Sequence, residues 1–221
     1  MPTRRRRRAA PARPARRRPA GRERDRDRTL ALLVQAGRDL FVKEGFERTT
    51  TRAISARAGV ATGTFFLHFR EKRDLLFHLF RDEVSAVVEE SFAAAPPAGA
   101  QLAERLLGVF GRLYAYYARD LRLARTFLKE LMFLAPGEHD EMMAMTLAFV
   151  GRLAAAIEAA RDRGEVDRAV DPSLAAQQAF AAYLFVLVAL LKGVAPLDVA
   201  RAQLAAHLGL LVRGLAPGSS A

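Results

Sequence analysis

The sequence contains no cysteine, which excludes disulfide bonds, thiolate metal sites and a cysteine nucleophile from its 221 residues. It also lacks a histidine pair with metal-binding spacing, because His78, His139 and His207 lie far apart. No glycine-rich phosphate loop and no acid–base or nucleophile motif is visible. We therefore expect a protein that is not an enzyme and that holds neither a metal ion nor a cofactor.

Long hydrophobic runs are also missing. The longest, residues 179–191, has 13 residues, whereas a membrane-spanning helix needs about 20. The basic first residues are not followed by the apolar stretch of a secretory signal. These absences predict a cytoplasmic protein without a membrane partner.

Positive charge is abundant but unevenly distributed. The net charge is +11, and residues 1–28 alone contain 13 arginines and 3 acidic residues. Residues 29–73 add +4, whereas residues 74–221 carry −3. This asymmetry suggests a polyanionic partner at one end of the molecule.

The arginine-rich segment 1–28 has no apolar face to bury, so we expect a disordered arm. Such an arm can lie along phosphates or enter a minor groove. The alternative is a solvated tail without a role.

From residue 29 onward, apolar residues recur at helical spacing, and no convincing strand alternation is visible. Helices are expected at about 29–44, from the Thr49–Thr51 cap to Gly59, from a Thr62 cap to about His68, and at about 72–92, 99–118, 120–134, 138–163, 171–192 and 197–214. The fold class is therefore all-α. Proline and glycine mark the breaks at residues 95–99, 136–137 and 196.

Two short predicted helices joined by residues 59–61 match the turn of a DNA-binding helix-turn-helix, from Thr49 to Phe69. Gly59 permits the positive φ of a tight turn, and Val60 can plug the crevice between the helices. A short second helix can place small polar side chains in a major groove, which is about 12 Å wide. The segment thus predicts binding to duplex DNA.

Residues 29–80 resemble the N-terminal domain of TetR-family transcriptional regulators. The residues that carry the resemblance are Leu40-Phe41, Gly45-Phe46, Thr49-Thr50, Ile54, Ala58-Gly59-Val60, Gly63-Thr64-Phe65-Phe66, His68-Phe69, Lys72 and Leu75-Leu76. The rest of the chain resembles the family only in length and helical layout.

The resemblance implies a homodimer that binds a near-palindromic operator and is released by a small molecule. It implies DNA contacts from Thr50, Thr51, Arg52, Thr62, Gly63, Thr64, Phe66, Leu67, His68 and Lys72. Lys72 is expected to reach a phosphate at the start of its helix, where amide groups also favour an anion. The expected division is an arm at 1–28, a helix-turn-helix DNA-binding domain at 29–74, a helical effector-binding and dimerisation domain at 75–216, and a flexible C-terminus at 217–221.

Phe66 departs from the family pattern, in which tyrosine is usual at this position. The ring can still pack on a sugar or a thymine methyl group, but the hydroxyl-to-phosphate hydrogen bond, worth about 1.5–3 kcal/mol, is lost. Phosphate contacts from the basic arm would compensate. Among the neighbours, Phe65, Leu67 and Phe69 can equally be packing residues. Arg52 can be a solvated surface charge, and His68 can cap or stack locally without a DNA contact.

Large, adaptable side chains in the second half of the chain suggest a ligand cavity. The candidates are Phe110, Tyr114, Tyr117, Phe127, Met132, Met145, Phe149, Phe180 and Tyr183. Their chemistry favours an apolar or aromatic effector. The alternative for each is an ordinary core position.

The last two predicted helices supply a candidate dimer interface. Its residues are Leu184, Val188, Leu191, Leu204, Leu208 and Leu211. Two such helices packed against their copies would form a four-helix interface.

The leading functional hypothesis is a ligand-responsive transcriptional regulator, most often a repressor in this family. One alternative is a constitutive or architectural DNA-binding protein without an effector. Another is a helical carrier or enzyme that uses the cavity.

Overall fold

The computed structural model describes residues 19–94, 99–135 and 137–218, with side chains from residue 23 onward. Residues 1–18 of the expected arm and the last three residues lie outside this part. Every regular element in the described ranges is a helix. The elements are α1 (Pro19–Glu44), α2 (Thr51–Arg57), α3 (Thr62–Phe65), α4 (Lys72–Ala93), α5 (Leu102–Tyr117), the 3-10 turn η1 (Ala118–Asp120), α6 (Leu121–Met132), α7 (Asp140–Asp162), α8 (Pro172–Leu191) and α9 (Leu197–Leu215). The all-α prediction is confirmed.

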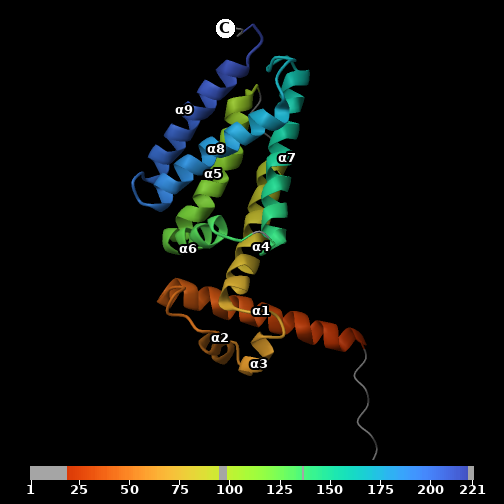
Figure 1. Cartoon of the computed structure of the whole chain (residues 1–221), viewed down its shortest axis with the longest axis vertical. Coiled ribbons are helices and arrows are strands. Elements are labelled where there is room, and N and C mark those ends of the chain that lie inside the picture. Colours follow the sequence, from red (N-terminus) through yellow and green to blue (C-terminus); the bar gives the residue numbers. More distant parts are fainter. Residues whose placement is uncertain (1–18, 95–98, 136, 219–221) are drawn as a thin grey trace, which may run out of the picture.

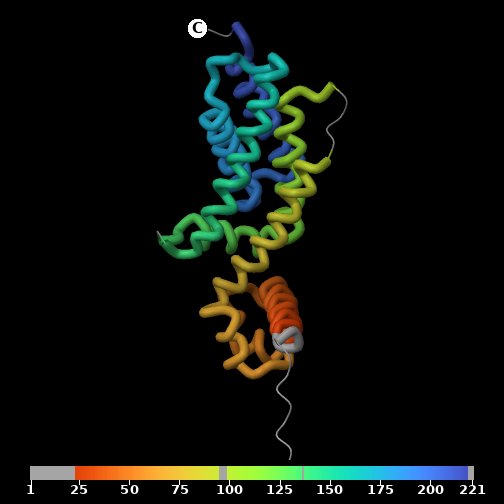
Figure 2. Tube along the Cα trace, turned by 90° about the vertical axis from the view of Figure 1, so that its right-hand side faces the viewer, coloured from red at the N-terminus to blue at the C-terminus, as the bar shows by residue number. Residues whose placement is uncertain are grey.

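The helices form two groups that share α4. Helices α1 to α3 lie together at one end of the molecule, and α5 to α9 form a larger bundle at the other (Figure 1). Helix α4 contacts α1 near its start and then runs into the bundle, where it packs against α5, α6 and α7 (Figure 2). The expected domain boundary after residue 74 therefore falls in the first turn of a continuous helix.

Helix α1 begins at Pro19, and the expectation of disorder is wrong for residues 19–28. Proline suits the first position of a helix because its φ is already helical and its missing N–H is not needed there. The Thr29 hydroxyl donates to the Asp25 carbonyl at 2.8 Å, one turn back, so Thr29 lies within the helix. Alternating charges did not stop the helix from extending beyond the apolar stripe.

Helix α8 is the most apolar element, and it lies within the bundle between α7 and α9. Its start matches the expectation from sequence: the Asp171 carboxylate accepts a hydrogen bond from the Ser173 N–H at 2.8 Å, and Pro172 occupies the first turn. Helices α7 and α8 are long and apolar enough to span a membrane by length and composition alone. Part of their apolar surface packs inside the bundle, since Leu153 and Ile157 of α7 and Val186 of α8 are fully buried.

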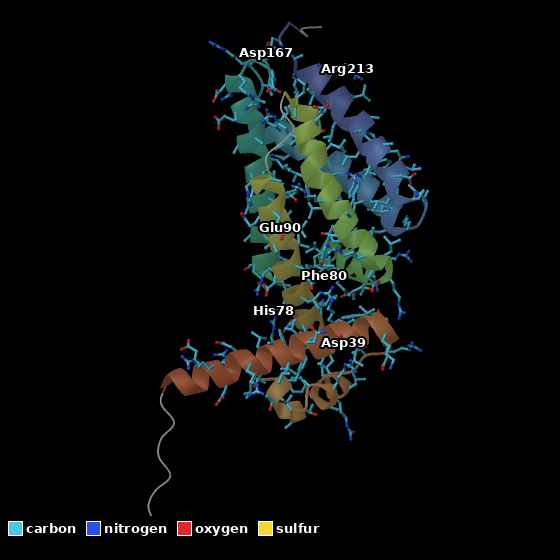
Figure 3. The ribbon with its side chains drawn as sticks, turned by 180° about the vertical axis from the view of Figure 1, so that it is seen from behind. Asp39, His78, Phe80, Glu90, Asp167 and Arg213 are labelled. Carbon is cyan, nitrogen blue, oxygen red and sulfur yellow. The ribbon has the colours of Figure 1, made fainter. Side chains whose placement is uncertain are left out.

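Aromatic rings link α4 to the bundle. The rings of Phe80 and Phe127 stack with centroids 4.1 Å apart and planes at 4°. Figure 3 places Phe80 on α4 beside the bundle, above Asp39 of α1. Phe77, about one helical turn before Phe80 on α4, also meets Phe127 edge-on, with ring centroids 6.0 Å apart. The long shared helix is thus anchored on α6 at the point where it leaves helices α1 to α3.

Candidate nucleic-acid interface and ligand cavity

The helix-turn-helix is built by local capping and a glycine turn. The Thr50 hydroxyl accepts the Ala53 N–H at 3.1 Å, which satisfies a free amide at the start of α2. Gly59 has φ +69°, so it occupies the left-handed conformation expected for the turn. Val60 is half-buried against the core between the two helices. These features confirm the predicted cap at the start of α2 and the glycine turn that ends it.

Helix α3 is shorter than expected. Its regular part is Thr62–Phe65, and residues 66–68 continue as a turn in which the His68 N–H donates to the Phe65 carbonyl at 2.9 Å. Thr62 is the first helical residue and does not cap the helix, because the cap position is Ala61. The segment therefore presents only about one turn of regular helix to a partner.

The expected DNA-contact residues form an exposed surface on α2, α3 and the following turn. Exposed members are Thr50, Arg52, Thr62, Gly63, Phe66 and Leu67, and half-buried members are Thr51, Thr64 and His68. The Phe66 side chain is 54% exposed and Leu67 is 76% exposed. By contrast, Phe65 and Phe69 are buried, so their packing interpretation holds.

His68 lies at the end of this surface, and its pKa is lowered from the usual value. Partial burial disfavours the charged ring, and the positive charge of Arg26 adds to the effect. A neutral imidazole offers one hydrogen-bond donor and one acceptor at neutral pH. The start of α1, which carries Arg26, thus adds positive charge near residues 62–68, called the reading segment below.

Lys72 differs from the expectation of a phosphate contact. Its ammonium donates to the carbonyls of Phe46 at 2.7 Å, Glu47 at 3.0 Å and Thr49 at 3.2 Å. An ammonium has three N–H groups, so all of them are used inside the domain. Lys72 fastens the loop before α2 to α4, and no proton is left for DNA in this arrangement.

A cavity of about 880 Å³ lies in the bundle, between α4, α5, α6, α7 and α8. Its lining includes seven of the residues expected from sequence, namely Tyr117, Phe127, Met132, Met145, Phe149, Phe180 and Tyr183. Volumes of about 300–1,000 Å³ are typical of small-molecule sites. The mostly apolar lining suits an apolar ligand.

Phe110 and Tyr114 are not part of the lining, contrary to expectation. Both are fully buried behind Tyr183, with their rings stacked on it at 4.8 Å and 5.3 Å. The Tyr114 hydroxyl donates to the Tyr183 carbonyl at 2.8 Å. These two residues therefore support the cavity wall without facing the cavity.

Two tyrosines provide polar groups inside the apolar wall. Burial raises the pKa of Tyr117 to about 12 and also raises that of Tyr183 well above its usual value. Both phenols therefore remain neutral at physiological pH. A neutral hydroxyl in an apolar wall can donate a hydrogen bond to a carbonyl oxygen of a ligand.

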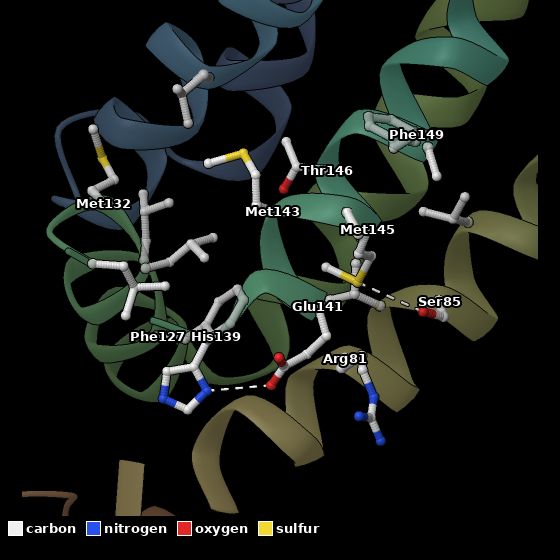
Figure 4. Close-up of a pocket in the computed structure, with 18 of the residues that line it drawn as sticks. Arg81, Ser85, Phe127, Met132, His139, Glu141, Met143, Met145, Thr146 and Phe149 are labelled. Carbon is white, nitrogen blue, oxygen red and sulfur yellow. Dashed lines mark hydrogen bonds and ion pairs between the residues drawn. The ribbon is translucent and has the colours of Figure 1, made fainter. Parts of the chain in front are cut away.

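Several polar residues that line the cavity were not among those predicted from the sequence. Arg81, Ser85 and Glu89 of α4 line the cavity, as do His139 and Glu141 at the start of α7. Figure 4 shows Ser85 facing Met145, with the Ser85 Oγ 3.6 Å from the Met145 sulfur. The four-residue spacing of the α4 set was a detectable signal, because it places all three side chains on one helix face.

Leu191, Leu204 and Leu208 of the predicted dimer stripe are buried within this chain, so their side chains are not available to a second copy. Leu184 is half-buried and lines the cavity. Of the six predicted interface residues, Val188 and Leu211 remain: both are half-buried, and neither lines the cavity. The leucine stripe of α9 is buried because α9 packs on α5 and α8 of the same chain.

A different face of α8 and α9 is apolar and exposed. Phe185 is 68% exposed, and Leu210 and Val199 of α9 are also exposed. The Phe185 ring meets His207 edge-on at 5.9 Å across the two helices. These residues, Phe185, Val199, His207 and Leu210, are called the α8–α9 face below.

Comparisons with known proteins agree with this architecture. Residues 33–79 match the family model described as bacterial regulatory proteins of the tetR family, and residues 99–186 match the tetracyclin repressor-like C-terminal domain. The HTH-type transcriptional regulator TcmR of Streptomyces glaucescens is 30% identical over 158 residues, which cover 67% of each chain. The chain belongs to the TetR family of transcriptional regulators.

Solved TetR-family structures share the whole fold. FadR of Bacillus subtilis, in complex with stearoyl-CoA, has a TM-score of 0.67 at 22% identity and covers 84% of this chain and 98% of its own. FadR of Thermus thermophilus, in complex with lauroyl-CoA, has a TM-score of 0.66 at 21% identity, with coverages of 87% and 100%. This TetR-family regulator therefore has the helix-turn-helix and the helical ligand domain of the family in one chain.

Proposed function

We propose that this regulator is a cytoplasmic repressor that binds a near-palindromic operator as a homodimer. It leaves the operator when a long-chain fatty acyl thioester occupies the cavity between α4 and α8. The observation that carries the proposal is this large, mostly apolar cavity, in the same chain as an exposed reading segment.

The exposed surface of α2 and α3 supports the DNA-binding part of the proposal. Thr62, Gly63 and Thr64 have small side chains, which allow the short helix to approach base edges closely. Arg52 is exposed in the first turn of α2 and is available for a phosphate contact. In a dimer, two such segments would read half-sites about one helical turn, or a little more, apart.

The cavity supports an acyl effector in preference to a small polar one. Its walls carry methionine, phenylalanine and leucine side chains, which adapt to a flexible chain. The hydroxyls of Tyr117 and Tyr183, which share a hydrogen bond, place a neutral polar pair in this wall for a carbonyl oxygen of the ligand. Two solved relatives in the same fold hold stearoyl-CoA and lauroyl-CoA, which favours this ligand class.

The α8–α9 face supports the homodimer. Phe185 and Leu210 are large apolar side chains exposed on neighbouring helices, and such a patch is typical of an interface. A two-fold axis across this face would bring four helices together. The reading segments lie at the opposite end of each protomer (Figure 1).

The proposal is tested by selecting a binding duplex from a random-sequence pool and then titrating octanoyl-, lauroyl- and stearoyl-CoA against the complex by fluorescence anisotropy. Each buried methylene contributes about 0.8 kcal/mol, so two more carbons should strengthen release by about tenfold until the cavity is full. Free CoA is the matched control and should not release DNA. If operator affinity stays constant with all three thioesters, the proposed effector class is wrong. If no duplex can be selected, the proposed DNA-binding function is wrong.

A further inference from the structure

The residue that precedes α7, His139, has an unusual backbone. Its φ of 51° and ψ of 53° place it in the left-handed region, and in the described part of the chain it is the one residue other than glycine with positive φ. Its side chain is also buried, with 4% exposed. A strained, buried polar residue persists only where its surroundings hold it, and such residues gather at functional positions.

The imidazole of His139 bridges the two parts of the molecule. Its Nε2 lies 3.2 Å from Oδ1 of Asp74, in the first turn of α4. Its Nδ1 lies 3.3 Å from Oε1 of Glu141, the contact drawn in Figure 4. The ring also meets Phe77 edge-on, with centroids 4.6 Å apart. These contacts fix the ring against the start of α4.

Asp74 continues the connection toward the reading segment. Its Oδ2 accepts the Arg70 backbone N–H at 2.8 Å and the Arg70 Nε–H at 3.1 Å. Arg70 directly follows Phe69, whose buried ring packs on Phe65 of α3 with centroids 5.5 Å apart. One carboxylate therefore holds both His139 of the ligand domain and the chain that leaves α3.

His139 also faces ligand space. It lines the cavity of about 880 Å³ and a smaller polar cavity of about 210 Å³, which His68, Arg70 and Asp74 border as well. Two other contacts between the two parts differ in this respect. Arg122 donates to the Glu44 carbonyl at 2.9 Å and Lys129 lies 3.8 Å from Glu47, but neither cation lines the large cavity.

We propose that His139 is the positioning residue that transmits effector binding to the reading segment. A ligand in the large cavity moves the imidazole away from Asp74, and the left-handed backbone at His139 relaxes. Asp74 then loses one of its two partners, and the turn at Arg70 after α3 changes its position relative to α4. The inference rests on the proposed function, because it assigns the regulation of that same cavity. It requires the ligand to favour the state in which the His139–Asp74 contact is broken.

The test measures coupling, defined as the operator Kd with saturating lauroyl-CoA divided by the Kd without it. By linkage, the same factor describes the effect of DNA on lauroyl-CoA affinity, so both directions can be measured. The variant His139→Gly removes the imidazole, and glycine adopts positive φ without strain. We expect a factor of about tenfold or more for the wild type, within the range usual for coupled sites, and below about threefold for the variant.

Asp74→Asn tests the same contact from the other side, and the double variant completes a cycle. If His139 acts through Asp74, each single variant lowers the coupling factor and the double variant lowers it no further. Lys129→Gln is the matched control, since it breaks an ion pair between the two parts that does not face the cavity. This control should keep the wild-type factor.

Wild-type coupling in both His139→Gly and Asp74→Asn would overturn the inference, as would losses that multiply in the double variant. Circular dichroism shows which variants fold, and Asp74→Asn decides the matter if His139→Gly does not. A wild type that binds DNA but does not respond to any acyl thioester would overturn the effector proposal and this inference together. Coupling in the wild type that survives in the variants would remove only the role of His139.

Discussion

The Lys72 ammonium lies 4.5 Å from the centroid of the Phe46 ring and donates to the Phe46 carbonyl at 2.7 Å. Cation–π attraction and three hydrogen bonds to carbonyls therefore act on one group. The carbonyls belong to the loop that connects α1 to α2, so Lys72 joins α4 to that loop. The lysine that resembles a phosphate ligand in sequence instead holds the α1–α2 loop against α4 in the folded chain.

Replacing Lys72 with methionine should therefore destabilise the DNA-binding domain. We expect a loss of about 1.5–3 kcal/mol in the free energy of unfolding, because the three carbonyls lose a charged donor. Urea unfolding followed by circular dichroism measures this loss. Lys43→Met, an exposed lysine in the last turn of α1, is the control and should change stability little.

The same variant separates the structural role from a DNA contact. A lysine that neutralises a phosphate adds about one unit to the slope of log affinity against log salt. We expect the slope of Lys72→Met to match that of the wild type. A slope reduced by about one unit would show that Lys72 leaves its carbonyls and reaches DNA.

Phe66→Tyr should strengthen operator binding. The ring is exposed directly after α3, so a hydroxyl there can donate to a phosphate. A hydrogen bond to a charged group is worth about 1.5–3 kcal/mol, which corresponds to tighter binding by about tenfold or more. Phe65→Tyr is the control, because that ring is fully buried and an added hydroxyl should only lower stability. An affinity equal to that of the wild type would mean that no phosphate passes Phe66.

Leu184→Trp should change chain-length selectivity. Leu184 lines the cavity from α8, and a larger side chain there removes room for the end of a long acyl chain. Excluding two methylenes costs about 1.6 kcal/mol, so stearoyl-CoA should bind about tenfold more weakly while lauroyl-CoA changes less. Isothermal titration calorimetry measures both. Leu174→Trp, on the exposed outer side of the same helix, should leave both affinities unchanged.

Phe185→Glu should convert the proposed dimer into monomers. A carboxylate at the centre of an apolar interface must be desolvated without a partner, which opposes association. Light scattering after size exclusion should show a monomer, and operator affinity should fall by about 100-fold or more because the two half-sites are no longer linked. Leu32→Glu, an exposed leucine of α1 in the other part of the molecule, serves as the control for oligomeric state. A dimer that survives the change would place the interface elsewhere.

Deletion of residues 1–18 should flatten the salt dependence of operator binding. This segment contains nine arginines and no acidic residue. Each phosphate that it contacts contributes about 0.9 to the slope of log affinity against log salt. An unchanged slope in the truncated protein would assign the arm no role in DNA binding.

The sequence alone was sufficient for features that depend on local rules. The Thr50 cap, the left-handed Gly59 and the Asp171–Pro172 helix start follow from short-range hydrogen bonding and backbone sterics. The apolar period also predicted the all-α fold, and the large apolar side chains predicted seven residues of the cavity lining. These signals lie within a few residues of each other, so no tertiary information was needed.

Faces and partners could not be predicted in the same way. Periodicity shows that Leu204 and Leu208 face apolar surroundings, but it does not say whether those belong to the same protomer or to another. Likewise, the positive charge of Lys72 suggests that it binds a phosphate. The carbonyl groups that it does bind belong to residues 23 to 26 positions earlier in the chain. Long-range packing alone brings such groups together.

The sequence by itself determined the helical fold, the helix-turn-helix and the family, because each rests on local spacing and capping. Only the tertiary structure decided that the leucine stripe of α9 is internal, that Phe185 and Leu210 form the exposed face, and that His139 touches Asp74. The reason is physical: a side chain's partner depends on which helices pack against its own. That choice minimises exposed apolar area over the whole molecule, and no single segment contains it.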